Sequence, residues 1–138
     1  MAVHVAMLRA VNVGGTGKLA MADLKAMCER AGFTSVATYI QSGNVVFASR
    51  ATAAGVKATL EAALETKLKK PVGVLVRSGS ELRGVLAANP FPAAAPNRVI
   101  VLFLDEVPPA AKVAVPTGPA GETLVARGRE LFVHYPEG

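Results

Sequence analysis

The sequence predicts an α+β fold, and three observations support that prediction. Apolar runs with the spacing of strands alternate with runs whose apolar residues recur at helical spacing. Glycine, proline and capping residues separate these runs at short intervals. The chain has 138 residues, of which 51% are hydrophobic, so it can build one core but is too short for two independent domains. We therefore expect a single domain over residues 1–138.

A glycine-rich segment separates the first predicted strand from the first predicted helix. Residues 3–8 form a short apolar run, which is typical of a buried strand. A helix is predicted over residues 21–31, with Gly32 as its C-terminal cap. Its apolar face consists of Leu24, Met27, Cys28 and Ala31. We expect Cys28 to be a buried thiol in the core rather than a nucleophile.

A hairpin, a second helix and a fourth strand follow. Residues 36–41 and 44–49 flank the dipeptide Ser42-Gly43, which favours a tight two-residue turn. The second helix is predicted over residues 52–69, with Thr52 as its N-cap, and the next strand over residues 72–76. This order of elements matches the split β-α-β unit of a ferredoxin-like domain. Both helices would cover one face of a four-stranded antiparallel sheet.

The remaining residues are predicted to form a smaller α+β extension, so residues 3–77 and 78–138 are the two halves of the domain. In the second half, a capping box begins a helix that ends before Asn89-Pro90. A strand over residues 98–104 and a hairpin over residues 123–135 complete the prediction. The extension therefore consists of one helix and about three strands.

Composition and targeting signals indicate a small cytoplasmic protein. The formal net charge of +5 comes from scattered lysines and arginines, which gives only weak attraction to anions. Residues 1–8 lack the basic segment and cleavage pattern of a signal peptide, and no stretch reaches the roughly 18 apolar residues of a membrane helix. The single cysteine excludes an internal disulfide. We therefore predict a cytoplasmic location and no membrane partner.

The glycine-rich loop after the first strand is the first candidate site. It comprises Asn12, Gly14, Gly15 and Lys18. The loop does not match the phosphate-binding P-loop, because Asn12 stands where the first glycine belongs and Leu19 where the magnesium-binding hydroxyl belongs. It does match a generic anion nest, in which glycine N–H groups converge and a lysine neutralises charge. The alternative is a strand-to-helix connection whose glycines serve only the turn.

The hairpin turn is the second candidate site. It comprises Gln41, Ser42 and Asn44. A two-residue turn pairs Gln41 with Asn44. It also pairs Tyr39 with Val46, so three polar side chains share one face and can hydrogen-bond a ligand. Arg9, at the end of the first strand, is the natural cation beside either loop. The alternative is that the amides cap the hairpin and the tyrosine packs against the second half.

The residues give little support for RNA recognition, metal binding or catalysis. An RNA-recognition module needs alternating aromatic residues on one strand, but residues 43–47 supply only Phe47, which shares the predicted core face with Val45. His4 and His134 have no carboxylate or cysteine spaced to share a metal, and we identify no acid/base pair for catalysis. The sequence therefore predicts no nucleic-acid partner, no metal and no cofactor.

Four separated sequence motifs in the chain resemble those of a bacterial family known as domain of unknown function 1697. They are LRAVNVGG at residues 8–15, YIQSGNVVF at 39–47, ANPF at 88–91, and RGRE followed by HYP within 127–136. The resemblance implies a ferredoxin-related α+β fold in a cytoplasmic bacterial protein, without an established activity. Members of this family usually continue past the last motif with a further helical segment. If that segment contributes to a site or covers one face of the sheet, we expect this chain either to lack the contribution or to leave apolar surface for a partner.

Two functional hypotheses follow from these observations. In the first, the two loops and Arg9 form a pocket for a small anionic or polar ligand. In the second, the residues of the two loops serve only to form turns, and an exposed apolar sheet face mediates self-association into a homo-oligomer. An enzymatic role is a third interpretation, supported only if pocket residues also polarise a substrate, and analogy of fold cannot strengthen it.

Overall fold

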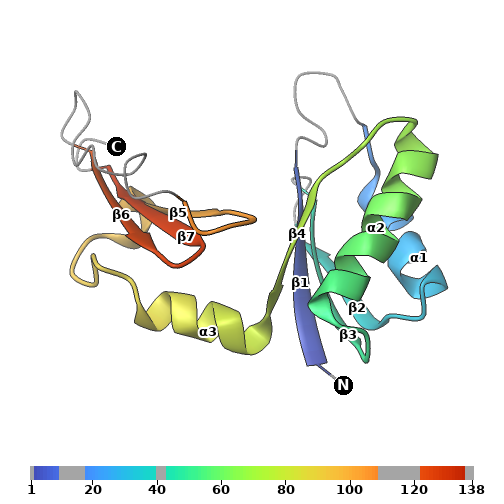
Figure 1. The fold of residues 1–138 in the computed structure, drawn as a ribbon, viewed down its shortest axis with the longest axis horizontal. Coiled ribbons are helices and arrows are strands. Elements are labelled where there is room, and N and C mark those ends of the chain that lie inside the picture. Colours follow the sequence, from blue (N-terminus) through green and yellow to red (C-terminus); the bar gives the residue numbers. More distant parts are fainter. Residues whose placement is uncertain (1, 10–17, 40–42, 109–121, 136–138) are drawn as a thin grey trace. The chain divides into compact units, whose positions relative to one another are not determined.

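The computed structural model describes residues 2–9, 18–39, 43–108 and 122–135 (Figure 1). The described residues form three α-helices and two antiparallel sheets, so the fold is mixed α+β, as the sequence predicts. The chain divides into two compact units, Met1–Leu82 and Arg83–Gly138. None of the described helices combines the length and the apolar character that crossing a bilayer requires.

The first unit contains four strands and two helices. They are β1 (Ala2–Leu8), α1 (Met21–Arg30), β2 (Thr34–Tyr39), β3 (Asn44–Ser49), α2 (Ala53–Leu68) and β4 (Val74–Ser78). The strand order in the sheet is β2-β3-β1-β4, and each neighbouring pair is antiparallel. All six elements predicted for this part of the chain are present, within a few residues of their predicted bounds.

The core of the first unit lies between one face of the sheet and the two helices (Figure 1). Side chains alternate along β1, so Ala6 and Leu8 are buried while Val3 is half exposed. On β3 the buried apolar positions are Val45 and Phe47, which is the core face that the sequence predicts. Both helices close over this face with buried residues: Leu24, Met27 and Cys28 of α1, and Val56, Leu60 and Leu64 of α2.

Local capping chemistry sets the ends of α2. The Thr52 hydroxyl accepts a hydrogen bond from the Gly55 N–H at 3.0 Å, so Thr52 is the N-cap that the sequence predicts. At the other end Lys69 takes a left-handed conformation, with φ of 62°, and its N–H donates to the Glu65 carbonyl. A C-cap of this kind ends the helix and redirects the chain toward β4.

The hairpin between β2 and β3 differs from the prediction. Tyr39 pairs with Asn44, so the predicted Tyr39–Val46 and Gln41–Asn44 pairings are wrong, and four residues separate the paired ends. The reason is long-range: Gly43 has a φ of 89°, and its carbonyl accepts a hydrogen bond from the Leu8 N–H at 3.1 Å. This bond joins the residue before Asn44 to the end of β1. The shift is by two positions, so Tyr39 and Asn44 still share a face.

The second unit is built around a three-stranded antiparallel sheet in the order β5-β7-β6. Its elements after α3 (Gly79–Ala87) are a 3₁₀ turn (Pro96–Arg98), β5 (Val99–Phe103), β6 (Thr123–Arg127) and β7 (Glu130–His134). The capping box that begins α3 is present, because the Ser78 N–H donates to Glu81 and the Glu81 N–H donates to the Ser78 hydroxyl. One helix and three strands agree with the prediction.

Cys28 gives the fold a measurable dependence on pH. Its thiol is fully buried, as predicted, and this burial together with the Glu29 carboxylate raises its pKa from about 9 to about 11. Above pH 9 the thiol ionises in the unfolded chain but stays protonated in the folded one. Rising pH therefore favours unfolding, and we expect a loss of about 1.4 kcal/mol by pH 10, continuing toward pH 11.

Urea denaturation of the wild type and of Cys28→Ala checks this expectation. At pH 8 the wild type is expected to be the more stable protein, because alanine leaves a cavity. The stability difference should narrow between pH 8 and pH 10, since only the wild type carries the thiol. A difference that stays constant over this range would contradict the expected ionisation.

His4 is a polar side chain that we expect to reduce stability. It is only 3% exposed, and neither ring nitrogen has a hydrogen-bond partner among the described residues. Its ring centroid lies 5.8 Å from that of Phe47, within the core. A buried polar group without a partner loses its hydrogen bonds to water, so we expect His4→Leu to raise the free energy of unfolding by about 1 kcal/mol in urea titrations. A marked loss of stability in this variant would mean that the imidazole has a stabilising role.

Candidate functional site

Both predicted ligand loops start at the same end of the first sheet. The Leu8 N–H donates to the Gly43 carbonyl at 3.1 Å, and the Arg9 N–H donates to the Gly73 carbonyl at 2.9 Å. Because β1 is antiparallel to β3 and β4, the last residues of β1 lie beside the first residues of both neighbours. We call this end of the sheet, marked by Arg9, Gly43 and Gly73, the loop end.

Three of the predicted site residues lie within the described part of the chain. They are Arg9, Lys18 and Asn44. The other five lie outside the described residues: Asn12, Gly14, Gly15, Gln41 and Ser42. Arg9 and Lys18 are exposed and Asn44 is half-buried, so each of the three charged or amide side chains has access to solvent.

Arg9, Tyr39 and Asn44 share the sheet face that the helices leave uncovered. Asn44 pairs with Tyr39 on one side and with Met7 on the other, and this row alternates with the buried row that contains Val45. Arg9 follows Met7 by two positions, which returns its side chain to the same face. Tyr39 is 69% exposed. The register thus brings a guanidinium, an amide and a phenol to one face at the loop end.

Lys18 stands apart from this row. It immediately precedes Leu19, which is buried in the core beneath the helices, and it comes just before the start of α1. Within the described residues, Lys18 has no hydrogen bond or ion pair with Arg9 or Asn44. The predicted grouping of Lys18 with the other two residues therefore stays a prediction.

Gly73 is a residue of the candidate site that the sequence reasoning missed. A Cβ atom placed on it would lie 3.2 Å from the Arg9 Cδ atom and 3.8 Å from the Arg9 Cγ atom. The Arg9 side chain therefore lies across Gly73, in space that any other residue would occupy. Gly73 is not among the glycines with positive φ, so its backbone does not itself require glycine. The available signal was a glycine directly before a strand that pairs with the strand carrying Arg9.

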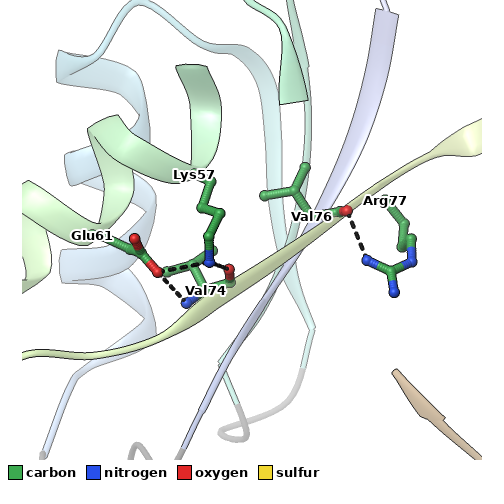
Figure 2. A network of polar contacts seen from close by, with 5 residues as sticks. All are labelled: Lys57, Glu61, Val74, Val76 and Arg77. Carbon is green, nitrogen blue, oxygen red and sulfur yellow. Dashed lines mark hydrogen bonds and ion pairs between the residues drawn. The ribbon is translucent and has the colours of Figure 1, made fainter. Parts of the chain in front are cut away.

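A second missed feature holds the start of β4 in place (Figure 2). The Glu61 carboxylate accepts hydrogen bonds from the Val74 N–H at 3.0 Å and from the Lys57 ammonium at 2.9 Å. Lys57 also donates to the Val74 carbonyl at 2.7 Å. The pair thus bonds both backbone groups of the residue after Gly73. Its sequence signal was the i,i+4 spacing of lysine and glutamate on the predicted helix.

The described side chains at the loop end supply a cation and hydrogen-bonding groups. A guanidinium offers a planar fork of donors to a carboxylate or phosphate, and an amide supplies both a donor and an acceptor. In the described part of the chain, no three His, Cys, Asp or Glu side chains gather to hold a metal ion. In the second unit, the His134 ring stacks on the Phe91 ring, with centroids 5.2 Å apart. The described groups favour recognition of an anion.

Comparison with known proteins gives the fold and the family of the chain. No curated protein matches it. Its fold is similar to that of a conserved bacterial protein from Streptococcus pneumoniae, with a TM-score of 0.81 and 24% sequence identity. That alignment covers 99% of this chain and 78% of the other. The family model described as protein of unknown function (DUF1697) matches residues 1–132, which confirms the resemblance noted in the sequence: the chain belongs to the DUF1697 family.

Proposed function

We propose that this protein binds a small anionic ligand at the loop end of the first sheet. The observation that carries the proposal is the placement of Arg9 and Asn44 at neighbouring strand ends, on the sheet face opposite α1 and α2. The glycine-rich segment follows Arg9 directly, and the predicted hairpin site precedes Asn44. A ligand at this position would therefore be within reach of both segments.

Each group in the proposed site has a distinct role. Arg9 neutralises the ligand's charge and can bond two of its oxygens at once. Asn44 and Tyr39 add directional hydrogen bonds, which would favour a ligand with further polar groups, such as a hydroxy acid or a phosphate ester. Lys69 and Lys70 lie in the connection from α2 to β4 and raise the positive potential of the loop end.

A thermal-shift screen tests the proposal with inorganic phosphate, citrate and nucleoside triphosphates as probes. A ligand at a hundredfold excess over its Kd stabilises a protein by about 2.7 kcal/mol, a rise of several degrees in Tm. We expect Arg9→Gln and Asn44→Ala each to abolish the shift. Arg50→Gln is the matched control, because Arg50 is an exposed arginine at the opposite end of β3. A shift lost equally in Arg50→Gln would mean nonspecific attraction.

Gly73→Ala provides a more selective test of the same site. The added methyl group must displace the Arg9 stem, so we expect the affinity for the bound probe to fall about tenfold. Stability should change little, because the backbone at this position suits other residues. If no probe shifts the wild type, the binding proposal is wrong, and size measurements of the protein in solution would then test the self-association hypothesis.

We also propose that the first unit has ferredoxin-like topology. The strand order β2-β3-β1-β4, with helices after β1 and β3, supports this assignment. Such a topology leaves one sheet face free of helices and places the β1–α1 and β2–β3 connections at the same end. It therefore suits a binding site assembled from these two connections.

A further inference from the structure

A groove in the first unit lies between α1 and α2, and its lining includes Lys69 but none of Arg9, Tyr39 and Asn44. Its volume is about 630 Å³. Its lining also includes Met27, Arg30, Ala31, Thr59, Ala63 and Lys67. The apolar and small residues among them form the trough of the groove, and every charged residue that lines the groove is a cation. A surface of this composition attracts acidic partners that also carry apolar side chains.

The cations are spread along the groove rather than gathered at one point. Lys67, near the end of α2, contacts Asp23 near the start of α1 at 3.5 Å, so the two helices run antiparallel. Arg30 is seven residues beyond Asp23 on α1, which is about 10 Å along the helix axis. A single small anion cannot reach both Arg30 and Lys67. Carboxylates two helical turns apart on a partner can do so.

The Lys67–Asp23 ion pair leaves the groove's positive charge available. Both side chains are about half exposed, and the separation of 3.5 Å is long for a charge-assisted bond. An exposed pair of this kind contributes little to stability, so Lys67 can exchange Asp23 for a partner's carboxylate at little cost. Arg30 and Lys69 add two further exposed cations on the rim.

We propose that this groove binds a short acidic amphipathic helix of a partner protein. A third helix seats its side chains between two packed helices when the groove has small residues, and Ala31, Thr59 and Ala63 are small. The spacing of Arg30 and Lys67 requires acidic residues at positions i and i+7 of the partner. Apolar residues at i+3 and i+4 would face the trough beside Met27.

Fluorescence titration with a labelled synthetic peptide tests the proposal. The probe is a 16-residue helical peptide with Glu at i and i+7 and Leu at i+3 and i+4. Its matched control moves both glutamates to the opposite helix face, which keeps composition and net charge unchanged. We expect the probe to bind with a Kd of tens of micromolar and the control at least fivefold more weakly, and higher salt to weaken the probe's binding.

Variants of the protein identify the groove as the site. We expect Arg30→Gln with Lys67→Gln to weaken binding of the probe about tenfold, and Thr59→Trp to abolish it by filling the trough. Lys25→Gln is the control, since Lys25 is an exposed lysine of α1 that does not line the groove. Circular dichroism establishes that each variant is folded. Arg9→Gln should leave peptide binding unchanged, which separates this test from that of the loop end.

Several outcomes would overturn the proposal. Equal binding of probe and control peptide would show that charge alone attracts them. Undiminished binding by the double variant, or no binding at 1 mM probe, would exclude the groove as a site for acidic helices. Competition by inorganic phosphate at low millimolar concentration, under constant ionic strength, would indicate a site for small anions instead.

Discussion

Phe47→Ala is expected to lower the free energy of unfolding by about 3–5 kcal/mol, a large part of the stability of a domain this size. Phe47 is 1% exposed and stacks on Phe33, with ring centroids 4.3 Å apart and planes within 5°. The His4 ring lies on the same side of the sheet at 5.8 Å. Alanine would remove the ring that joins β3 to the segment after α1, and the surrounding backbone can close only part of the cavity.

Urea denaturation measures this effect, with Tyr39→Ala as the matched control. Tyr39 is an aromatic residue on the neighbouring strand, but it is 69% exposed, so we expect its loss to change stability by less than about 0.5 kcal/mol. Phe47→Leu should lose less than half as much stability as Phe47→Ala, because leucine fills most of the volume that the phenylalanine ring occupies. If Phe47→Ala and Tyr39→Ala cost the same, the assignment of Phe47 to the core would be wrong.

The elements of the fold could be predicted because their signals are local. Alternation placed Val45 and Phe47 on the core face, and Thr52 capped the helix that follows. The hairpin register could not be predicted in the same way. It depends on the hydrogen bond from Leu8 to Gly43, which joins residues 35 positions apart, and no local pattern encodes the length of turn that this bond selects.

In the candidate site too, residues with a local sequence signal could be predicted, and residues whose role depends on a long-range contact could not. Arg9 and Asn44 were identified because a cation and an amide interrupt strand ends, and the topology then placed those ends side by side. Gly73 was missed because its role depends on Arg9, 64 residues earlier in the chain. The hydrogen bond from the Val74 N–H to Glu61 was missed for the same reason. The helical spacing of Lys57 and Glu61 predicts their ion pair, but it does not show that Glu61 also binds β4.

The bonds from Glu61 and Lys57 to Val74 are part of a series that occupies the free edge of β4. In the strand order β2-β3-β1-β4, β4 has a neighbour on one side only, so alternate residues direct their backbone groups outward. Charged side chains bond groups on each of the three outward residues. Glu61 and Lys57 bond Val74, Arg77 donates to the Val76 carbonyl at 3.1 Å (Figure 2), and Glu81 accepts from the Ser78 N–H at 2.9 Å. The edge is therefore closed to another strand along much of its length.

Glu61→Ala is expected to lower the free energy of unfolding by about 2 kcal/mol and to promote self-association. The variant leaves the Val74 N–H without its acceptor and Lys57 without its carboxylate partner, and hydrogen bonds to charged groups contribute about 1.5–3 kcal/mol. We place the effect in the lower part of that range because the Glu61 side chain is 34% exposed. The freed N–H also offers a pairing site to a strand of a second molecule.

Urea denaturation and light scattering measure the two effects of Glu61→Ala. Glu65→Ala is the matched control, because it removes an exposed glutamate one turn further along α2. Glu61→Gln keeps an oxygen acceptor for Val74 but loses the charge, so it should cost about half as much as alanine and leave the protein monodisperse. If Glu61→Ala and Glu65→Ala behave alike, the carboxylate does not hold the strand. If Glu61→Ala is destabilised without associating, Lys57 and the remaining edge contacts are enough to exclude a second strand.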